Sequence, residues 1–450
     1  MRVALETLGC RLNEAELETW AQQFRLRGYQ LTSDSERADL LVINTCAVTQ
    51  EAVKKSRQLI RRCRRHNPGA KLVVSGCYSS LHPEVLREID GIDLLVHNRD
   101  KARLVERVHT ELAPEAMPMD AREPEAHPLF QRGRNRAFIK VQDGCRYQCS
   151  FCIVTVARGA ERSKPVAEVI AEINALHQQG INEVILTGVH IGGYGSDLGS
   201  SLVELIDQVL VHTDIPRVRL GSLEPWELDD GFLQLFDNPR FMPHLHLPMQ
   251  SGSDTVLRRM ARRCKTGAFR RLLDEAKGRV ADLNVTTDII VGFPGESAAE
   301  WQQTLEFVEG CGFSHIHIFP YSVRSGTRAA GLSDQVGAAE KKRRCRQLHL
   351  LGEGLKREFM QGFVGREMEV LLEDDRQECG GQVVYSGYTA NYLKVVIPAG
   401  YCEHQVNRII PVRLDGYLVT EQRLSGVPVQ ATVVGSVSDR SDVAVSAALS

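Results

Sequence analysis

Long apolar runs and a dominant charge are both missing from this sequence. No segment of its 450 residues approaches the roughly 18 uninterrupted apolar residues needed to span a bilayer, and residues 1–6 contain no signal-peptide core. Lys and Arg number 55 against 57 Asp and Glu, and 43% of the residues are hydrophobic. Such proportions are ordinary for folded domains and exclude a largely disordered or fibrous chain. We therefore expect a cytoplasmic protein without membrane contact.

Internal repeats and low-complexity tracts are also absent, and the length suggests about three domains. The chain has 12 cysteines, but a disulfide framework is not expected in a reducing cytoplasm. Cysteines there serve as small buried hydrophobes, as ligands or as nucleophiles, and their spacing separates these roles. Six have no ligand spacing: Cys63, Cys264, Cys311, Cys345, Cys379 and Cys402.

The predicted N-terminal domain covers residues 1–103. Three short apolar runs, typical of buried parallel strands, lie at 3–5, 40–43 and 72–74. The segments 13–27 and 49–65 between them have helical composition. This alternation predicts a doubly wound parallel sheet, whose ligands gather at the carboxyl ends of its strands. Residues 104–135, rich in proline and without a sustained period, are predicted to form a linker.

Two further domains are predicted after the linker. In the segment 136–360, candidate strands lie at 138–141, 184–186, 218–220, 244–247, 285–291 and 315–319. Their alternation with helices predicts a partial α/β barrel. Short β-branched runs at 369–372, 383–385, 392–397, 409–414 and 427–434 then predict a small all-β barrel over 361–435, followed by a tail at 436–450. The expected fold class is α/β with this all-β addition.

Three cysteines stand close together in the run Cys145-Arg146-Tyr147-Gln148-Cys149-Ser150-Phe151-Cys152, just after the first predicted barrel strand. Zinc sites want four ligands, commonly two C-x2-C pairs, and the next cysteine is only at position 264. Three thiolates without a fourth suit an iron-sulfur cluster with one open iron. The loop is too polar for three thiols to serve as packing.

This C-x3-C-x2-C run, with an aromatic residue before its last cysteine, resembles the radical S-adenosylmethionine enzymes. The resemblance implies that Cys145, Cys149 and Cys152 hold a catalytic 4Fe-4S cluster whose open iron binds S-adenosylmethionine. Reductive cleavage of that cofactor gives a 5'-deoxyadenosyl radical, which suits a C–H bond too inert for a side-chain base.

Three other cysteines, Cys10, Cys46 and Cys77, each follow one of the predicted N-terminal strands. Because parallel strands end at one edge of their sheet, residues 36 and 31 positions apart can converge there. A single cysteine at a strand end is more often core than ligand, but three at equivalent points favour a metal site.

The combination resembles one branch of the superfamily, the methylthiotransferases. Matching segments are TLGCRLN at 7–13, NTCAVT at 44–49, SGC at 75–77, LTGVHI at 186–191, GSLEP at 221–225, HLPMQSGSD at 246–254 and TDIIVGFPGE at 287–296. The resemblance implies that Cys10, Cys46 and Cys77 hold a second 4Fe-4S cluster. One S-adenosylmethionine then donates its methyl to a sulfur held there, and a second one generates the radical.

The candidate cofactor-binding residues are Tyr147, Phe151, Gly188, Glu224, Gln250, Ser251 and Asp288. Gly188 would give the cofactor backbone room. Gln250 and Ser251 follow a barrel strand and form either a cofactor contact or a structural turn. Glu224 and Asp288 are candidates for contact with the ribose or the ammonium group. By contrast, three histidines alternate with apolar residues and are expected to belong to the core or to line the barrel rather than to act as ligands: His246, His315 and His317.

The branches of this family act on isopentenyl-adenosine of tRNA, on threonylcarbamoyl-adenosine of tRNA, or on an aspartate of a ribosomal protein. Arg11, directly after Cys10, is most similar to the threonylcarbamoyl branch, where Lys or Arg follows this cysteine. The resemblance thus implies addition of a methylthio group to C2 of N6-threonylcarbamoyladenosine at position 37 of tRNA. The competing interpretation is a non-radical iron-sulfur or zinc protein that binds RNA or senses redox state.

The implied partners are tRNA and a one-electron reductant such as flavodoxin or ferredoxin. The C-terminal barrel looks like the TRAM RNA-binding domain of this family, although residues 363–425 carry nine acidic and six basic residues. Basic residues gather elsewhere, at 54–65, 258–265 and 341–346, where either phosphate contact or a solvated helix face is possible.

Overall fold

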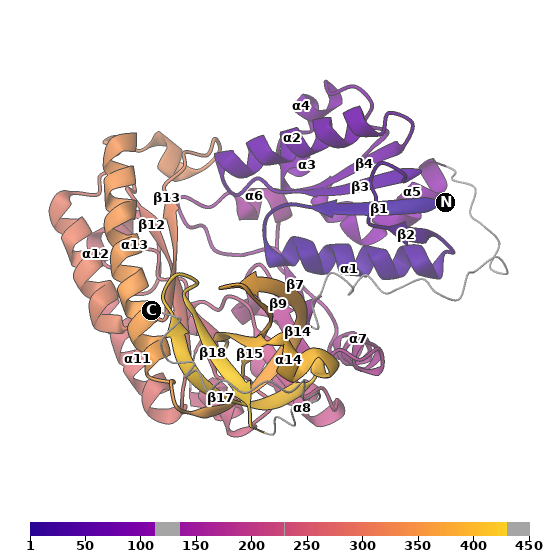
Figure 1. Cartoon of the computed structure of the whole chain (residues 1–450). Helices are drawn as coiled ribbons and strands as arrows, with labels where there is room; N and C mark the ends of the chain where they lie inside the picture. The colour runs from indigo at the N-terminus through magenta and orange to yellow at the C-terminus, as the bar shows by residue number, and fades with distance from the viewer. Residues whose placement is uncertain (113–135, 229, 430–450) are drawn as a thin grey trace.

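The computed structural model describes residues 1–112, 136–228 and 230–429, which form an N-terminal sheet with its helices, a central set of strands and helices, and a C-terminal barrel (Figure 1). The N-terminal part is a parallel sheet in the order β2-β1-β3-β4-β5, with helices on both faces. Its elements are β1 (Arg2–Thr7), α1 (Arg11–Leu26), β2 (Gln30–Thr32), β3 (Leu40–Thr45), α2 (Gln50–His66), β4 (Lys71–Gly76), α3 (Cys77–Leu81), α4 (Pro83–Arg87), β5 (Leu94–Val96), the 3-10 helix η1 (Asn98–Arg103) and α5 (Leu104–Glu111).

The doubly wound sheet is confirmed, and its three central strands match the predicted apolar runs. The edge strands β2 and β5 were not predicted, because three residues are too few to show a period. The linker prediction was wrong at its start. Leu104, Val105 and Val108 pack into the N-terminal core as the apolar side of α5. Residues 113–135 of the predicted linker lie outside the described residues.

The central part contains six parallel strands in two sheets, β10-β9-β6 and β11-β12-β13. A parallel bridge between Ser222 and His246 joins β10 to β11, so the strands follow one another as a partial barrel. The helices lie outside this barrel. For example, Val169, Ile173 and Leu176 of α7 recur at helical spacing and face the core.

The elements of the central part begin with β6 (Arg136–Lys140), β7 (Gln142–Asp143), α6 (Val154–Arg158), β8 (Arg162–Ser163), α7 (Val166–Gln178), β9 (Glu183–Thr187), η4 (Ile191–Gly193), α8 (Leu202–His212), β10 (Arg217–Leu220) and η5 (Pro225–Glu227). They continue with α9 (Asp230–Gln234), η6 (Leu235–Asp237), β11 (His244–His246), α10 (Asp254–Arg259), α11 (Thr266–Arg279), β12 (Asn284–Val291), α12 (Ala298–Cys311), β13 (His315–Pro320), η7 (Arg328–Gly331) and α13 (Ala338–Gln361).

The C-terminal part is a closed barrel in the order β14-β15-β16-β18-β17. Its elements are β14 (Glu367–Cys379), β15 (Gln382–Thr389), β16 (Lys394–Pro398), α14 (Ala399–Cys402), η8 (Glu403–Gln405), β17 (Ile409–Leu418) and β18 (Arg423–Pro428). The last strand was predicted too late, at 427–434. Leu424, which fills the barrel core, lies in β18. Residues 430–435 and the predicted tail at 436–450 lie outside the described residues.

Two buried arginines join the C-terminal barrel to the central part. Arg136 of β6 donates to the Glu373 carboxylate at 2.8 Å, and its guanidinium lies 4.2 Å from the centre of the Tyr388 ring. Arg217 of β10 donates to the backbone carbonyls of Tyr388 and Glu369. The barrel is thus fixed against the amino-terminal ends of the central strands.

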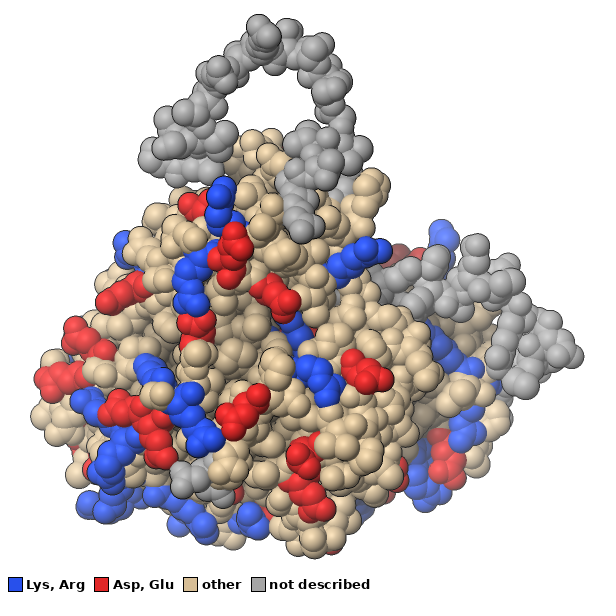
Figure 2. Space-filling model, turned by 90° about the horizontal axis from the view of Figure 1, so that it is seen from below, with Lys and Arg blue, Asp and Glu red and all other residues tan. Residues whose placement is uncertain are grey.

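The surface carries both signs of charge. On the face in Figure 2, basic and acidic side chains are interspersed, in agreement with the net charge of -2. Among the residues that the structure describes, no helix has the length and apolar character to cross a bilayer.

Candidate functional site

The three distant cysteines meet at one edge of the N-terminal sheet. Cys10 caps the start of α1, Cys46 follows β3, and Cys77 begins α3 directly after β4. Because β1, β3 and β4 are parallel neighbours, their carboxyl ends lie together. Gly9 shows the closeness, because it has φ +108° and a Cβ there would lie 2.6 Å from the Cys46 sulfur. The predicted convergence of these strand ends is confirmed.

The Cys46 thiol does not ionise readily by itself. Burial raises the pKa of Cys46 to about 11, and the neighbouring Cys10 and Cys77 contribute to the rise. A bound metal takes the place of the proton and makes each thiol a thiolate ligand. Three cysteines at one sheet edge and in the wall of one cavity therefore fit an iron-sulfur cluster with three protein ligands.

Two asparagines hold the loops that carry these cysteines. Asn13 donates to the carbonyls of Leu8 and Thr45, at 2.7 and 3.3 Å, and so joins the ends of β1 and β3. Asn98 donates to the Cys77 sulfur at 3.6 Å and to the carbonyl of Ala157 at 2.8 Å. The second contact reaches α6 of the central part.

A buried ion network lies beside the same triad. The Glu16 carboxylate of α1 accepts hydrogen bonds from Lys101 at 2.5 Å, from Arg158 at 2.9 Å and from Lys140 at 3.1 Å. Arg158 also donates to Asp143 at 3.0 Å. With Arg162, 3.9 Å from Asp143, four cations face these two carboxylates, and the surplus positive charge suits a neighbouring cluster whose thiolate ligands are negative.

Arg158 connects the two cysteine triads. It ends α6, which begins two residues after Cys152, and its guanidinium donates to the Asn13 side chain at 3.0 Å. Because Asn13 holds the loop around Cys10, one short helix links the C-x3-C-x2-C loop to the sheet edge.

The close cysteine triad lies on the loop between β7 and α6. Its sulfurs accept hydrogen bonds: the backbone N–H of Tyr147 donates to Cys145, and that of Val154 to Cys152, both at 3.4 Å. Burial raises the pKa of Cys145 to about 12, with its two companion sulfurs contributing. N–H donors aimed at sulfur stabilise thiolates, so this loop fits an iron-sulfur cluster.

A zinc site at this place is less well supported. Ligand atoms of Cys145, Glu161 and His190 lie within 4.8 Å of one another. However, both ring nitrogens of His190 are used, Nδ1 with Glu161 at 2.6 Å and Nε2 with Glu227 at 3.0 Å. Although burial lowers the pKa of His190, the two carboxylates raise it above its usual value. Both ring nitrogens therefore face carboxylate oxygens, and neither is turned toward a metal position.

The aromatic residue of the motif is held by groups that sequence inspection missed. The Tyr147 hydroxyl donates to Glu227 at 2.8 Å and accepts from the Trp226 indole at 3.0 Å. The guanidinium of Arg263 lies 4.5 Å from the Tyr147 ring centre. Trp226 and Glu227 follow the GSLEP segment directly, which was the available signal.

Glu224 is paired inside the protein. Its carboxylate accepts two hydrogen bonds from Arg262, at 2.6 and 3.1 Å, and the same guanidinium lies 3.9 Å from the Cys149 sulfur. The Arg262 side chain is 2% exposed, so it does not offer the phosphate contact considered for its basic cluster. Its charge instead lies beside the loop that carries Cys145, Cys149 and Cys152. Contact of Glu224 with the cofactor stays a prediction.

The remaining candidates have different surroundings. The Ser251 side chain is fully buried, and its hydroxyl contacts Thr304 and the Ser253 backbone, which favours the structural turn. Gln250 has φ +78° in the same turn. Phe151 packs against the core cluster around Met260.

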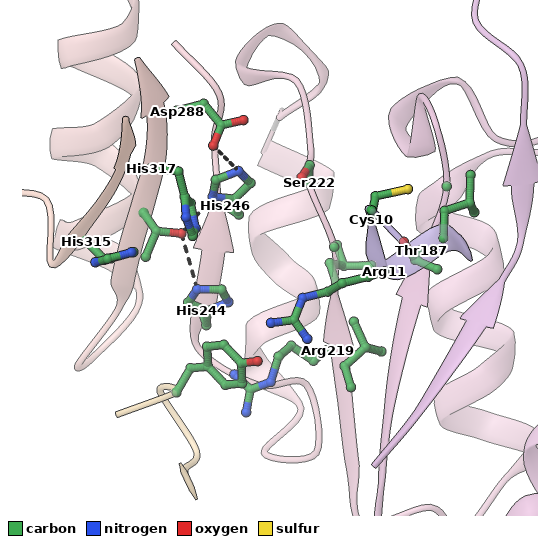
Figure 3. A pocket seen from close by; sticks show the side chains of 18 of the residues that line it. Cys10, Arg11, Thr187, Arg219, Ser222, His244, His246, Asp288, His315 and His317 are labelled. Atoms are coloured by element: carbon green, nitrogen blue, oxygen red, sulfur yellow. Dashed lines mark hydrogen bonds and ion pairs between the residues drawn. The ribbon is translucent and has the colours of Figure 1, made fainter. Parts of the chain in front are cut away.

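Gly188 and Asp288 instead line one large cavity. This cavity has a volume of about 770 Å³ and is lined by all three parts of the molecule (Figure 3). Cys10, Cys46 and Cys77 line it on the N-terminal side. On the barrel side, Asp288 lies 3.2 Å from Nε2 of His246. His246, His315 and His317 line it as well, as the sequence predicted for barrel-lining residues.

Both parts of the chain that carry a cysteine triad match known protein families. Residues 2–97 match the uncharacterized protein family UPF0004, and residues 139–308 match the radical SAM superfamily. A protein of Bacillus subtilis, threonylcarbamoyladenosine tRNA methylthiotransferase MtaB, is 36% identical over 92% of this chain and 93% of its own length. The chain belongs to the radical S-adenosylmethionine methylthiotransferases.

Other relatives of this methylthiotransferase have the same type of name. The MtaB protein of Thermotoga maritima is 36% identical over 87% of this chain and 90% of its own length. The tRNA-2-methylthio-N(6)-dimethylallyladenosine synthase of Roseobacter denitrificans is 32% identical over 92% of this chain and 96% of its own length.

A solved structure supports the fold of the methylthiotransferase. The radical S-adenosylmethionine methyltransferase TsrM from Kitasatospora setae, with cobalamin and a [4Fe-4S] cluster bound, aligns with a TM-score of 0.56. The alignment has 16% identity and covers 73% of this chain and 77% of that one. Enzymes of the methylthiotransferase family use S-adenosylmethionine and two 4Fe-4S clusters, and this chain offers two cysteine triads whose surroundings fit them.

Proposed function

We propose that this methylthiotransferase adds a methylthio group to C2 of N6-threonylcarbamoyladenosine at position 37 of tRNA. The observation that carries the proposal is the 36% identity, over nearly the whole length, to relatives named for that substrate. The cavity between the three parts supports it, because the distant cysteine triad and the carboxyl ends of the barrel strands line one space. A sulfur donor and a radical source must both reach one substrate atom, and such a shared space allows it.

The chain's own residues would hold and orient the reacting groups. Bound S-adenosylmethionine supplies a methyl group in one event and a 5'-deoxyadenosyl radical in another. Cys145, Cys149 and Cys152 would hold the cluster that binds it, with Arg262 compensating the thiolate charge. The distant triad would hold the second cluster, beside the positive Arg158.

Binding of tRNA would use the basic face of α2. This helix carries seven Lys and Arg residues between positions 54 and 65, and six of them are exposed: Lys54, Lys55, Arg57, Arg61, Arg62 and Arg65. Helix α2 begins beside the loop after β13, where the Gln50 backbone N–H donates to the Ser322 hydroxyl. Exposed guanidinium groups that recur at helical spacing suit the RNA backbone.

The proposal also includes an electron donor and a cellular compartment. A one-electron reductant such as flavodoxin or ferredoxin would supply the electron for cofactor cleavage. We place the reaction in the cytoplasm, where reducing conditions would preserve both clusters.

Mass spectrometry of tRNA nucleosides from cells lacking the gene tests the substrate. Loss of the methylthio form of threonylcarbamoyladenosine, restored by the intact gene, is the expected result. Loss of the methylthio form of dimethylallyladenosine instead would favour the second candidate, which rests on the 32% identity to the Roseobacter denitrificans synthase. If anaerobically reconstituted protein forms no 5'-deoxyadenosine, the non-radical interpretation would replace both.

A further inference from the structure

The cavity between the three parts carries a surplus of positive charge. Among the residues that the structure describes, five of the lining residues are Lys or Arg, whereas Asp288 is the one acidic lining residue. Three of the five have carboxylate partners: Arg158 with Glu16, Arg219 with Glu183, and Lys394 with Asp375. Arg11 and Lys356 have no ion pair with any residue that the structure describes. A cavity of this kind is built for an anionic ligand.

Arg11 projects into this cavity from the start of α1 (Figure 3). Its guanidinium lies 4.9 Å from the centre of the Phe138 ring and has no hydrogen bond to any described residue. It follows Cys10 directly, so it lies next to the proposed sulfur-donating cluster. Its planar fork of N–H donors matches the two oxygens of a carboxylate.

Arg219 provides an independent sign of a missing ligand. This residue is 1% exposed, and its Nε and Nη2 atoms both donate to Glu183 at 3.1 Å. Its Nη1 is buried and has no hydrogen-bond partner in the described part of the chain. Nδ1 of His244, also in the cavity wall, is buried and unpaired in the same way. A buried N–H without an acceptor costs about 1–3 kcal/mol, which a ligand oxygen would relieve.

The histidines report the same positive surroundings. Burial lowers the pKa of His244 well below its usual range, and Arg219 and Arg11 lower it further. Burial likewise lowers the pKa of His317, with Arg11 contributing. Burial and the neighbouring cations thus disfavour the charged form of both rings, and Arg11 and Arg219 are the guanidinium groups beside them.

We infer that Arg11, together with Nη1 of Arg219, binds the α-carboxylate of the threonine moiety of the substrate nucleoside. This inference rests on the proposed function, and it names the residues that would distinguish its substrate from an uncharged one. A dimethylallyl group has no acceptor, so it would leave the Arg219 N–H unpaired and bring an apolar group against two guanidinium groups.

Equilibrium binding without a reductant tests the inference before any chemistry occurs. The probes are two anticodon stem-loop RNAs, one with N6-threonylcarbamoyladenosine and one with the threonine carboxylate converted to a carboxamide. We expect the reconstituted wild-type enzyme to bind the acid about 10- to 100-fold more tightly, because hydrogen bonds to a charged group contribute that much. Equal affinity for the two RNAs would overturn the inference, and this comparison needs no variant.

Substitutions then assign the discrimination to Arg11. Arg11→Gln should weaken binding of the acid by the same factor and leave the amide unchanged, and Arg11→Lys should restore part of the loss. Arg87→Gln, on the exposed face of α4, should behave as wild type. Iron content and 5'-deoxyadenosine formation without RNA show that Arg11→Gln still loads both clusters. Equal weakening of both RNAs by Arg11→Gln would contradict a carboxylate contact.

One further outcome tells whether the bound carboxylate belongs to the nucleoside or to the cofactor. Another separates failure of this inference from failure of the proposed function. The methionine part of S-adenosylmethionine also has an α-carboxylate. If Arg11→Gln raises the KM for this cofactor in cleavage without RNA and leaves RNA discrimination intact, the inference fails. If the wild-type enzyme discriminates acid from amide but forms no methylthio product on the acid, the proposed function fails while the carboxylate site stands.

Discussion

Removing the charge of Glu16 should loosen the N-terminal domain beside its cysteine triad. The Glu16 side chain is 3% exposed and lies within 3.1 Å of Lys101, Arg158 and Lys140. In a Glu16→Gln variant, Arg158 and Lys140 keep Asp143 as a partner. Lys101, also 3% exposed, loses its carboxylate partner and keeps the Asn44 amide oxygen at 3.0 Å and the Trp20 ring, whose centre lies 5.8 Å from the ammonium nitrogen.

The magnitude follows from leaving this ammonium group buried without a counter-charge. Breaking a buried ion pair by removing one partner costs about 3–5 kcal/mol. About 1.4 kcal/mol corresponds to a tenfold change in an equilibrium constant. Amides that exchange by local opening of this part of the domain should therefore exchange at least about 10²- to 10³-fold faster. Lys101→Met in the same chain should recover part of the loss, because it removes the uncompensated charge.

Native-state hydrogen exchange with mass spectrometry measures the effect locally, which suits a chain of several domains. Peptides from α1 and η1 should accelerate, whereas peptides from α12 in the central part serve as an internal reference. Glu106→Gln is the matched control, because Glu106 pairs with Arg103 on the surface of the same domain. Unchanged exchange in α1 of Glu16→Gln would refute the idea that this network holds the domain.

The pH dependence of amide protection in α1 should also report the charge of Glu16. Burial alone would raise the pKa of Glu16, but Lys101, Arg158 and Lys140 lower it well below its usual range. A carboxyl with a depressed pKa in the folded state contributes stability above its unfolded pKa, about 4.5, and loses it as the pH falls toward the folded value. The wild-type protein should therefore lose protection in α1 below about pH 4.5 more steeply than Glu16→Gln.

Other predictions concern the cluster, the RNA surface and the barrel contact. Cys46→Ala should keep 5'-deoxyadenosine formation and lose methylthio product, with iron falling from about eight to about four per chain; full product would contradict the donor role. Arg57→Glu with Arg61→Glu should weaken tRNA binding and reduce the slope of log affinity against log salt by about two, measured by filter binding from 50 to 200 mM salt; an unchanged slope would remove α2 from the interface. Arg136→Met leaves Glu373 and Glu183 without this buried partner, so limited proteolysis should release the C-terminal barrel sooner than in wild type, and equal cleavage rates would show that other contacts suffice.

The sequence by itself determined the features that depend on local pattern. Apolar runs located the central strands β1, β3 and β4 of the N-terminal sheet, because a strand buried on both faces must be apolar throughout. The radical loop was recognisable from spacing alone, since Cys145, Cys149 and Cys152 lie within eight residues. The distant triad was predictable one step further, because parallel strands end at a common edge.

The tertiary structure decided what distant side chains do to each other. A run of basic residues suggested phosphate contact around Arg262, yet its guanidinium is buried between Glu224 and the radical loop. Charge in a sequence does not tell which side chain turns inward, because partners that neutralise it come from other elements. For the same reason, no local pattern indicated that Arg11 and Arg219, 208 positions apart, face one cavity. The role of Arg11 depends on the cavity that it faces and that of Arg219 on its burial, and both exist only once the three parts are packed together.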